Sequence, residues 1–147
     1  MALALVSFGI CQASQAIASA GSEQSLPNIT KFEFSDTADG FQEWLESGPA
    51  NNTVYEGVLE GSGEHVYTGI TKQPLSSRLA QHRYAGKNFK ELQKIYNGLT
   101  RNQARAIETY LIQYGYANRL NKILSISTQH RYYADAMRWA AFYLGGL

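Results

Sequence analysis

Residues 53–71 read TVYEGVLEGSGEHVYTGIT, and this stretch decides the fold. Residues 53–59 and 65–71 are both rich in β-branched and aromatic side chains, which favour strands. The tract between them, Glu60-Gly61-Ser62-Gly63-Glu64, has the composition of a turn. The two runs therefore predict a β-hairpin.

Two helices are predicted downstream of the hairpin. The first covers about residues 74–84, with Pro74 in its first turn and Ala85-Gly86 at its end. The second covers 101–114 and begins after Thr100, a good N-cap residue. The first helix aligns Leu75, Leu79 and His82 along one side, and the second aligns Ala104, Ile107, Leu111 and Tyr114 as its expected buried stripe. Residues 88–98 fit either a short helix or a third strand.

The remaining elements complete an α+β (α/β) layer, a small antiparallel sheet built on the hairpin and flanked by helices. A short acidic helix is expected around 38–46, and an apolar run follows a turn at 121–127. A final helix is expected at 135–144, well buried through Met137, Trp139, Ala140, Ala141 and Phe142. We predict residues 1–50 as an N-terminal segment with an apolar head, a linker and the acidic helix, and residues 51–147 as the folded domain.

The first twenty residues carry no charge, and their apolar run is too short to span a bilayer, so no stable membrane insertion is expected. Ala18-Ser19-Ala20 resembles a signal-peptide cleavage site, although the basic start of a signal peptide is missing. The alternatives are a helix that packs on another surface and the edge of a longer polypeptide. The single cysteine, Cys11, excludes an internal disulfide, and His65, His82 and His130 lack zinc-ligand spacing.

Charge is distributed unevenly along the chain, although the net charge is only +1. Residues 1–71 hold one lysine against nine acidic residues, a net charge of −8, whereas residues 72–147 hold twelve basic residues against three acidic ones, a net charge of +9. This asymmetry indicates nucleic-acid contact, and a solvated basic face beside an acidic neighbour is the alternative. The basic residues of the central stretch are Lys72, Arg78, Arg83, Lys87, Lys90, Lys94, Arg101 and Arg105.

Glu108 projects from the apolar side of its predicted helix. A carboxylate in that position needs a partner such as a cation or a metal ion, because an unpaired buried charge is costly. A structural ion pair with an arginine is one interpretation, and a metal ligand or general base is the other. Arg78 and His82, four residues apart, are neighbours on one helical face. They form either a phosphate clamp or an ordinary surface arginine beside a half-buried histidine.

The ordered set of these residues resembles the GIY-YIG nuclease family over about residues 53–127. Thr53-Val54-Tyr55 stands at the position of the family's GIY motif, and Tyr67-Thr68-Gly69 at that of its YIG motif. Arg78 and His82 follow on the next helix, and Glu108 stands where the family has its metal-binding glutamate. Two positions depart from the pattern, because Thr53 replaces a glycine and Thr68 an isoleucine.

The resemblance implies a metal-dependent endonuclease that hydrolyses phosphodiester bonds, of DNA in preference to RNA. Glu108 would bind Mg²⁺ or Mn²⁺, and Arg78 would hold the phosphoryl oxygens as charge develops. Tyr55 would accept the proton of the attacking water if Arg78, the metal or a neighbouring donor lowers its pKa, or it would relay that proton. Tyr67 would orient the water or Tyr55, and His82 would donate to a phosphate or assist in proton transfer. Gly69 and Asn121 would support the site. The expected backbone-binding residues are Lys72, Arg83, Lys87, Lys90, Lys94, Arg101 and Arg105.

Residues 98–108 and 121–127 are similar to one branch in particular, the C-terminal nuclease modules of polymorphic bacterial toxins. That similarity implies a larger delivery polypeptide, a cognate immunity protein, and secretion or delivery into the cytoplasm of a target cell. A housekeeping nuclease for repair or mobile elements, which would be cytoplasmic, is one alternative. A module that binds nucleic acid without cutting is another, as is an interaction domain unrelated to nucleic acid.

Overall fold

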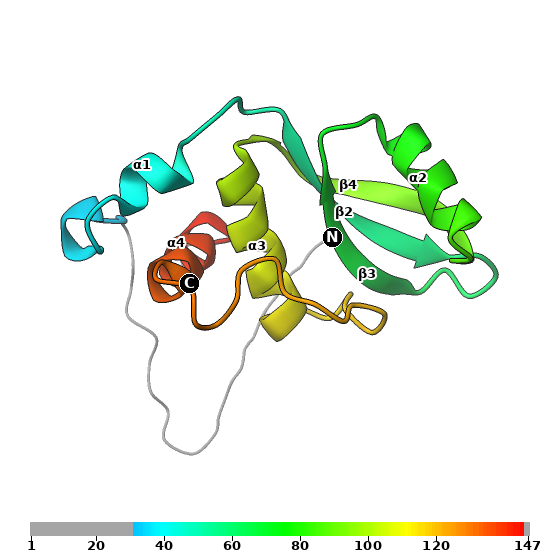
Figure 1. Cartoon of the computed structure of the whole chain (residues 1–147). Helices are drawn as coiled ribbons and strands as arrows, with labels where there is room; N and C mark the ends of the chain where they lie inside the picture. The colour runs from blue at the N-terminus through cyan, green and yellow to red at the C-terminus, as the bar shows by residue number, and fades with distance from the viewer. Residues whose placement is uncertain (1–30, 146–147) are drawn as a thin grey trace, which may run out of the picture. The chain divides into compact units, whose positions relative to one another are not determined.

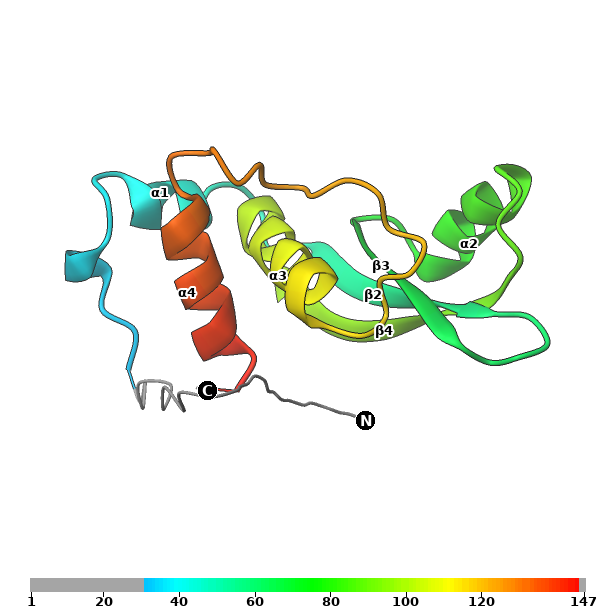
Figure 2. The same ribbon diagram turned by 90° about the horizontal axis from the view of Figure 1, so that it is seen from below.

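The computed structural model describes residues 31–145, all of which belong to one compact unit. Its sheet is small and antiparallel and is flanked by helices, which confirms the α+β prediction (Figures 1 and 2). The elements in chain order are η1 (Phe34–Asp36), α1 (Phe41–Leu45), β2 (Asn52–Leu59), β3 (His65–Thr71), α2 (Leu75–Tyr84), β4 (Phe89–Leu99), α3 (Arg101–Tyr114) and α4 (Tyr133–Tyr143).

The sheet has the order β3-β2-β4, with both pairings antiparallel. The predicted hairpin is confirmed, and its register sets Tyr55 opposite Gly69 and Gly57 opposite Tyr67. Residues 88–98, expected as either a short helix or a third strand, fall almost wholly in β4, which pairs with the second edge of β2. This pairing satisfies backbone groups of β2 that would otherwise be buried without partners.

Two apolar clusters lie on opposite faces of β2. Val54 packs into a cluster with α1, α3 and α4, whereas its neighbour Tyr55 packs into a cluster with Phe89 and Leu92 of β4. Alternation along a strand sends adjacent side chains to opposite faces. Helix α3 lies beside α4, away from α2 (Figures 1 and 2).

Helix α3 begins at Arg101 as predicted, after a complete capping box formed by Thr100 and Gln103. Its expected buried stripe is correct at Ala104 and Ile107, whereas Leu111 is only half-buried. Tyr114 is the error, because its side chain is 65% exposed. It is the last residue of the helix, where its ring contacts Tyr110 and its hydroxyl lies near Tyr133 of α4, but most of the side chain stays in solvent.

Helix α4 begins at Tyr133, two residues before the predicted start, and ends at Tyr143. Met137, Trp139 and Ala140 are buried as expected, but Ala141 and Phe142 are only half-buried, so the helix is covered less completely than its composition suggested. Residues 121–127 form no regular element and run as an irregular segment after α3.

The described part of the predicted N-terminal segment, residues 31–50, packs into the same core as the later helices. Phe41 and Leu45 are fully buried in the cluster with α3 and α4. The Thr100 hydroxyl donates to the Leu45 carbonyl at 2.5 Å, which ties α1 to the start of α3. The boundary at residue 50 stays a prediction. Residues 1–30, with the apolar run and Cys11, lie outside the described residues, and no helix within residues 31–145 has the length and apolarity to cross a membrane.

Candidate active site

Tyr55, Arg78 and His82 form one hydrogen-bonded group. The Nε of Arg78 donates to the Tyr55 hydroxyl at 3.1 Å, and that hydroxyl lies 2.8 Å from Nε2 of His82. Arginine has only donors, so the Tyr55 oxygen accepts from Arg78 and its own proton is free to point at His82. With the Tyr55 proton in that direction, Nε2 of His82 is the acceptor and a neutral imidazole carries its own proton on Nδ1.

The ionisation of this group follows from burial. Burial raises the pKa of Tyr55 to about 12, against the opposing effect of the Arg78 hydrogen bond. Burial, together with the charges of Arg78 and Lys87, lowers the pKa of His82 to about 4. At neutral pH the group therefore contains a protonated phenol and a neutral imidazole. Of the two roles expected for Tyr55, these values, which hold for the protein without a bound metal ion, favour the proton relay.

The Tyr67 ring packs against the rings of Tyr55 and His82. Its ring centroid is 6.3 Å from that of Tyr55 and 5.1 Å from that of His82, and it is half-buried. Lys87 Nζ lies 5.7 Å from the centre of the Tyr67 ring, within cation–π range. Burial and the Glu108 carboxylate raise the pKa of Tyr67, and Arg78 opposes them.

Gly69, predicted to support the site, has a packing reason to be glycine. A Cβ at this position would lie 2.6 Å from both Cζ and the hydroxyl oxygen of Tyr55, and 2.8 Å from Cε1 of Tyr67. The absence of a side chain therefore lets the two tyrosines lie against the strand. Gly57 of β2 likewise leaves room for a ring. A Cβ at Gly57 would lie 2.7 Å from Cζ of Phe89.

The end of α2 places Lys87. The N–H of Lys87 donates to the His82 carbonyl and the N–H of Gly86 to that of Arg83, both at 3.0 Å. This is a Schellman motif, and Gly86 supplies its left-handed residue with φ of 93°. The predicted stop at Ala85-Gly86 is confirmed, and the same motif connects Lys87 to the backbone of His82.

Glu108 is buried on α3, with 7% of its surface exposed. The Ser125 hydroxyl donates a hydrogen bond to its carboxylate, and no lysine or arginine nitrogen within residues 31–145 forms an ion pair with it. The arginine ion pair considered as an alternative is therefore not what holds this residue. Burial raises the pKa of the carboxyl, against the Ser125 hydrogen bond and the charges of Arg101, Arg105 and Arg78.

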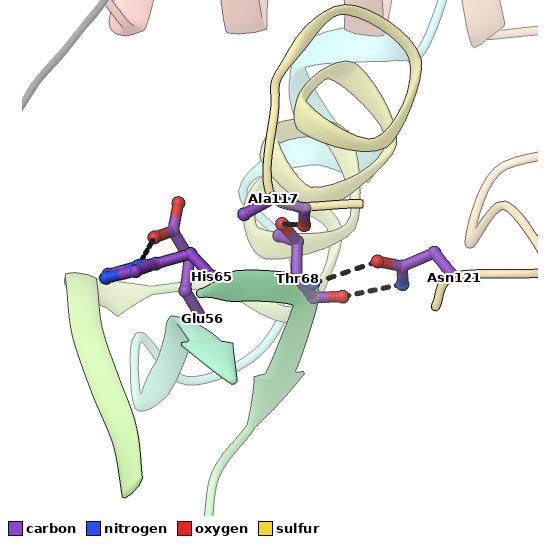
Figure 3. Close-up of polar contacts among 5 residues, drawn as sticks. All are labelled: Glu56, His65, Thr68, Ala117 and Asn121. Atoms are coloured by element: carbon purple, nitrogen blue, oxygen red, sulfur yellow. Dashed lines mark hydrogen bonds and ion pairs between the residues drawn. The ribbon is translucent and has the colours of Figure 1, made fainter. Parts of the chain in front are cut away.

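Asn121 acts on the backbone of β3 (Figure 3). Its side-chain oxygen accepts from the Thr68 N–H and its side-chain nitrogen donates to the Thr68 carbonyl, both at 2.9 Å. The Thr68 hydroxyl donates to the Ala117 carbonyl at 2.7 Å, and the Leu120 N–H donates to the Val66 carbonyl at 2.8 Å. Residues 117–121 therefore lie along the edge of β3 that β2 does not pair, and Asn121 positions this segment.

A hollow of about 470 Å³ opens between this segment and the end of α2. Glu108 and Tyr67 line it, together with Ala85, Gly86, Lys87, Leu120, Asn121, Lys122 and Ile123. Tyr55, Arg78 and His82 do not line it, and the rings of Tyr55 and His82 lie against that of Tyr67, which does.

The possible metal ligands at the hollow suit an ion such as Mg²⁺ that keeps most of its waters. They do not suit a metal ion whose ligands all come from protein side chains. Within the described residues no three histidine, cysteine, aspartate or glutamate side chains gather as ligands. A single buried carboxylate, Glu108, beside an open hollow suits Mg²⁺ or Mn²⁺, because Mg²⁺ keeps most of its waters and takes one or two carboxylates with substrate phosphates.

The predicted backbone-binding residues have different surroundings. Lys72, Lys90, Lys94 and Arg101 are exposed, and Lys87 is half-buried at the hollow. Two arginines are used internally. Arg83 donates to the Phe89 and Lys90 carbonyls at 3.0 and 2.9 Å, and Arg105 donates to the Ser125 carbonyl at 2.7 Å.

A scan of family models and searches of curated proteins and of solved structures find no match to this chain. The functional assignment of this site therefore rests on the residues and geometry described above.

Sequence reasoning missed several contributors to this region. Ser125 and Lys122 lie in the irregular segment, where no periodicity relates them to Glu108. Glu56 had a usable signal, a carboxylate between Val54 and Val58 on one face of a strand. It is buried and accepts from Nδ1 of His65 at 2.6 Å (Figure 3), and burial raises its pKa. Glu56 does not line the hollow.

Proposed function

We propose that the chain is a metal-dependent endonuclease of the GIY-YIG type that hydrolyses phosphodiester bonds of nucleic acid, DNA in preference to RNA. One observation carries the proposal. Tyr55, Tyr67, Arg78 and His82 come from three elements and lie in contact, and Tyr67 shares a hollow with Glu108. Scattered core tyrosines and a solvated arginine would not require this convergence.

Each residue has a role that its surroundings allow. A Mg²⁺ or Mn²⁺ ion held by Glu108 would neutralise charge on the scissile phosphate and the leaving oxygen. Ser125 orients the Glu108 carboxylate through its hydrogen bond. Arg78 uses Nε for Tyr55 and one terminal nitrogen for Gln81, which leaves further N–H groups for phosphoryl oxygens. Lys87 and Lys122 add positive charge at the hollow.

Proton transfer would run through Tyr55 as a relay. Tyr55 does not line the hollow, so the proton of the attacking water would reach it through Tyr67. The protonated Tyr55 phenol would accept that proton only as it gives its own to Nε2 of His82. Tyr67 lines the hollow and would orient the attacking water, which matches the role expected for it.

The proposal is tested by incubating supercoiled plasmid and total RNA with the purified protein, with Mg²⁺ or with chelator. We expect metal-dependent cutting of plasmid that Glu108→Gln reduces by about a hundredfold or more. Cutting that persists at the wild-type rate in Glu108→Gln, or that needs no metal, would contradict the assignment. Faster degradation of RNA would keep the nuclease proposal and reverse the substrate preference.

A second candidate is a module that binds nucleic acid without cutting it. One observation favours it: Tyr55 is fully buried, and the pKa values of Tyr55 and His82, about 12 and about 4, are both far from neutrality. A general acid or base works best with a pKa near the working pH. Salt-sensitive binding with no cleavage under Mg²⁺ or Mn²⁺ would select this candidate.

For the biological setting we propose a bacterial toxin module neutralised by a cognate immunity protein, rather than a housekeeping nuclease. The support is the sequence similarity of residues 98–108 and 121–127 to such modules. Expression in a bacterial host discriminates the two. A toxin arrests growth, and Glu108→Gln relieves the arrest, whereas a housekeeping nuclease is tolerated.

A further inference from the structure

The hollow beside Glu108 has a mixed apolar and cationic lining. Lys87 lies at the end of α2, and Lys122 lies on the irregular segment that follows α3. Leu120 and Ile123 supply apolar surface on that segment, and Ile123 is 82% exposed. Single exposed apolar residues are ordinary on protein surfaces, but this one adjoins a lysine on the lining of a concave site.

The segment that carries Ile123 is anchored two residues earlier. Asn121 makes two hydrogen bonds to the Thr68 backbone (Figure 3). Leu120 makes one to the Val66 carbonyl. Two residues beyond Ile123, Ser125 donates to the Glu108 carboxylate. Ile123 is therefore held between two fixed points while its own side chain faces water.

The opposite wall is anchored as well. The Schellman motif at Gly86 bonds Lys87 to the His82 carbonyl, and the Lys87 ammonium lies near the face of the Tyr67 ring. The hollow thus has one anchored cationic group for phosphate, Lys87, a second and exposed one, Lys122, and an apolar surface with nothing to cover it among the described residues.

We propose that this hollow is a subsite for a nucleotide whose base is unstacked from its neighbours, next to the phosphate at Glu108. The protein would therefore bind single-stranded nucleic acid in preference to duplex. This inference rests on the proposed function and names the substrate class of its site. Intact duplex keeps its bases stacked inside. Its phosphates can therefore contact the two lysines, but its bases cannot contact Leu120 and Ile123. A single strand offers both, as in sites that combine a basic groove with surfaces for bases.

Charge alone predicts the opposite preference, because duplex presents phosphates at higher density than a single strand. This makes the preference a sharp test. The probes are fluorescently labelled twelve-nucleotide single strands of DNA and RNA and the matching blunt DNA duplex, titrated with the full chain at one fixed salt concentration in chelator. We expect the single strands to bind at least about ten times more tightly than the duplex. Equal affinity, or tighter binding of duplex, overturns the proposal.

Ile123→Ala isolates the apolar contribution, and because the side chain is exposed the fold should tolerate the change. We expect about a five-fold loss of single-strand affinity, from losing the apolar surface that the base would cover on Ile123, with duplex affinity unchanged. Tyr114→Ala, an exposed aromatic that does not line the hollow, is the matched control and should change neither affinity. A loss shared equally by single strand and duplex in Ile123→Ala, or no loss in either, would refute the subsite.

Binding in chelator is measured without cleavage, so the two proposals fail separately. Metal-dependent cutting with no single-strand preference keeps the nuclease and removes the subsite. A single-strand preference sensitive to Ile123→Ala, without any cutting, keeps the subsite and removes the nuclease.

Discussion

The Tyr55 hydroxyl stands between Nε of Arg78 at 3.1 Å and Nε2 of His82 at 2.8 Å. One atom thus accepts from a permanent cation and donates to a neutral imidazole inside the protein. The arrangement makes Tyr55 a link in a proton path rather than a free base, and it also makes Tyr55 a structural residue. Both consequences can be measured.

Tyr55→Phe should lower stability and cleavage together. The change leaves buried His82 without its partner, and an unsatisfied buried polar group costs about 1–3 kcal/mol of unfolding free energy. Loss of the relay should reduce plasmid cleavage by about 10²–10⁴-fold. Urea unfolding and initial cleavage rates measure the two effects. Tyr84→Phe, which removes a hydroxyl from a side chain that is 97% exposed, is the control and should change neither. A Tyr55→Phe protein that cuts at the wild-type rate would exclude the relay.

Stability should fall as pH drops from about 7 toward 4 because of His82. Its pKa in the folded protein, about 4, lies below the ordinary value of 6.5, so the unfolded chain binds the proton more readily. The stabilisation is present above pH 6.5 and is lost as pH falls through this window, by roughly 3 kcal/mol in full. Comparing urea unfolding of wild type and His82→Gln from pH 7 to pH 4 isolates this contribution, because the acidic groups are common to both. Parallel curves would show that His82 is not the cause.

Glu108→Gln should separate stability from activity. The raised pKa of Glu108 indicates that its charged form is disfavoured by burial, so a neutral side chain of the same shape should leave the melting temperature unchanged or higher. Cleavage should nevertheless be lost, since an amide binds Mg²⁺ poorly. In the wild type, cleavage should rise with pH as the carboxyl ionises. A lower melting temperature for Glu108→Gln would indicate a structural role for the charge.

Gly69→Ala should disturb the site through Tyr55. A Cβ at residue 69 would lie 2.6 Å from Cζ of Tyr55, and such overpacking typically costs about 1–3 kcal/mol. Residue 69 has no positive φ, so backbone strain is not a competing cause. A double-mutant cycle with Tyr55→Leu checks the mechanism. The cost of Gly69→Ala should shrink when the ring is absent, and strictly additive costs would contradict it.

The basic residues should divide into two groups. Arg83→Ala should lower the unfolding free energy by about 1–3 kcal/mol, because it removes two hydrogen bonds that join α2 to β4. Lys94→Ala, at an exposed position on β4, should leave stability unchanged but reduce the salt dependence of nucleic-acid binding by about one ion. Binding titrations over a salt series, beside urea unfolding of both variants, measure this. The reverse pattern would contradict the division.

Local patterns predicted most of the elements and much of the membership of the candidate site. Alternation and turn residues predicted the hairpin, the Thr100 cap and Gly86 marked helix ends, and the apolar stripe placed Glu108 inside. These signals repeat within a few residues, so a single chain displays them. Residues 89–99 could not be assigned in this way, because the choice of strand depended on an open edge of β2 elsewhere in the sequence.

The sequence by itself determined the types of chemical group available and the elements that carry them. Only the tertiary structure decided their partners. Tyr55 meets His82 across 27 residues, and Asn121 meets Thr68 across 53. The raised pKa of Tyr55, the neutral state of His82 and the exposure of Ile123 all follow from these encounters. Burial and hydrogen bonding depend on which surfaces meet in three dimensions, and periodicity along the chain carries no record of that.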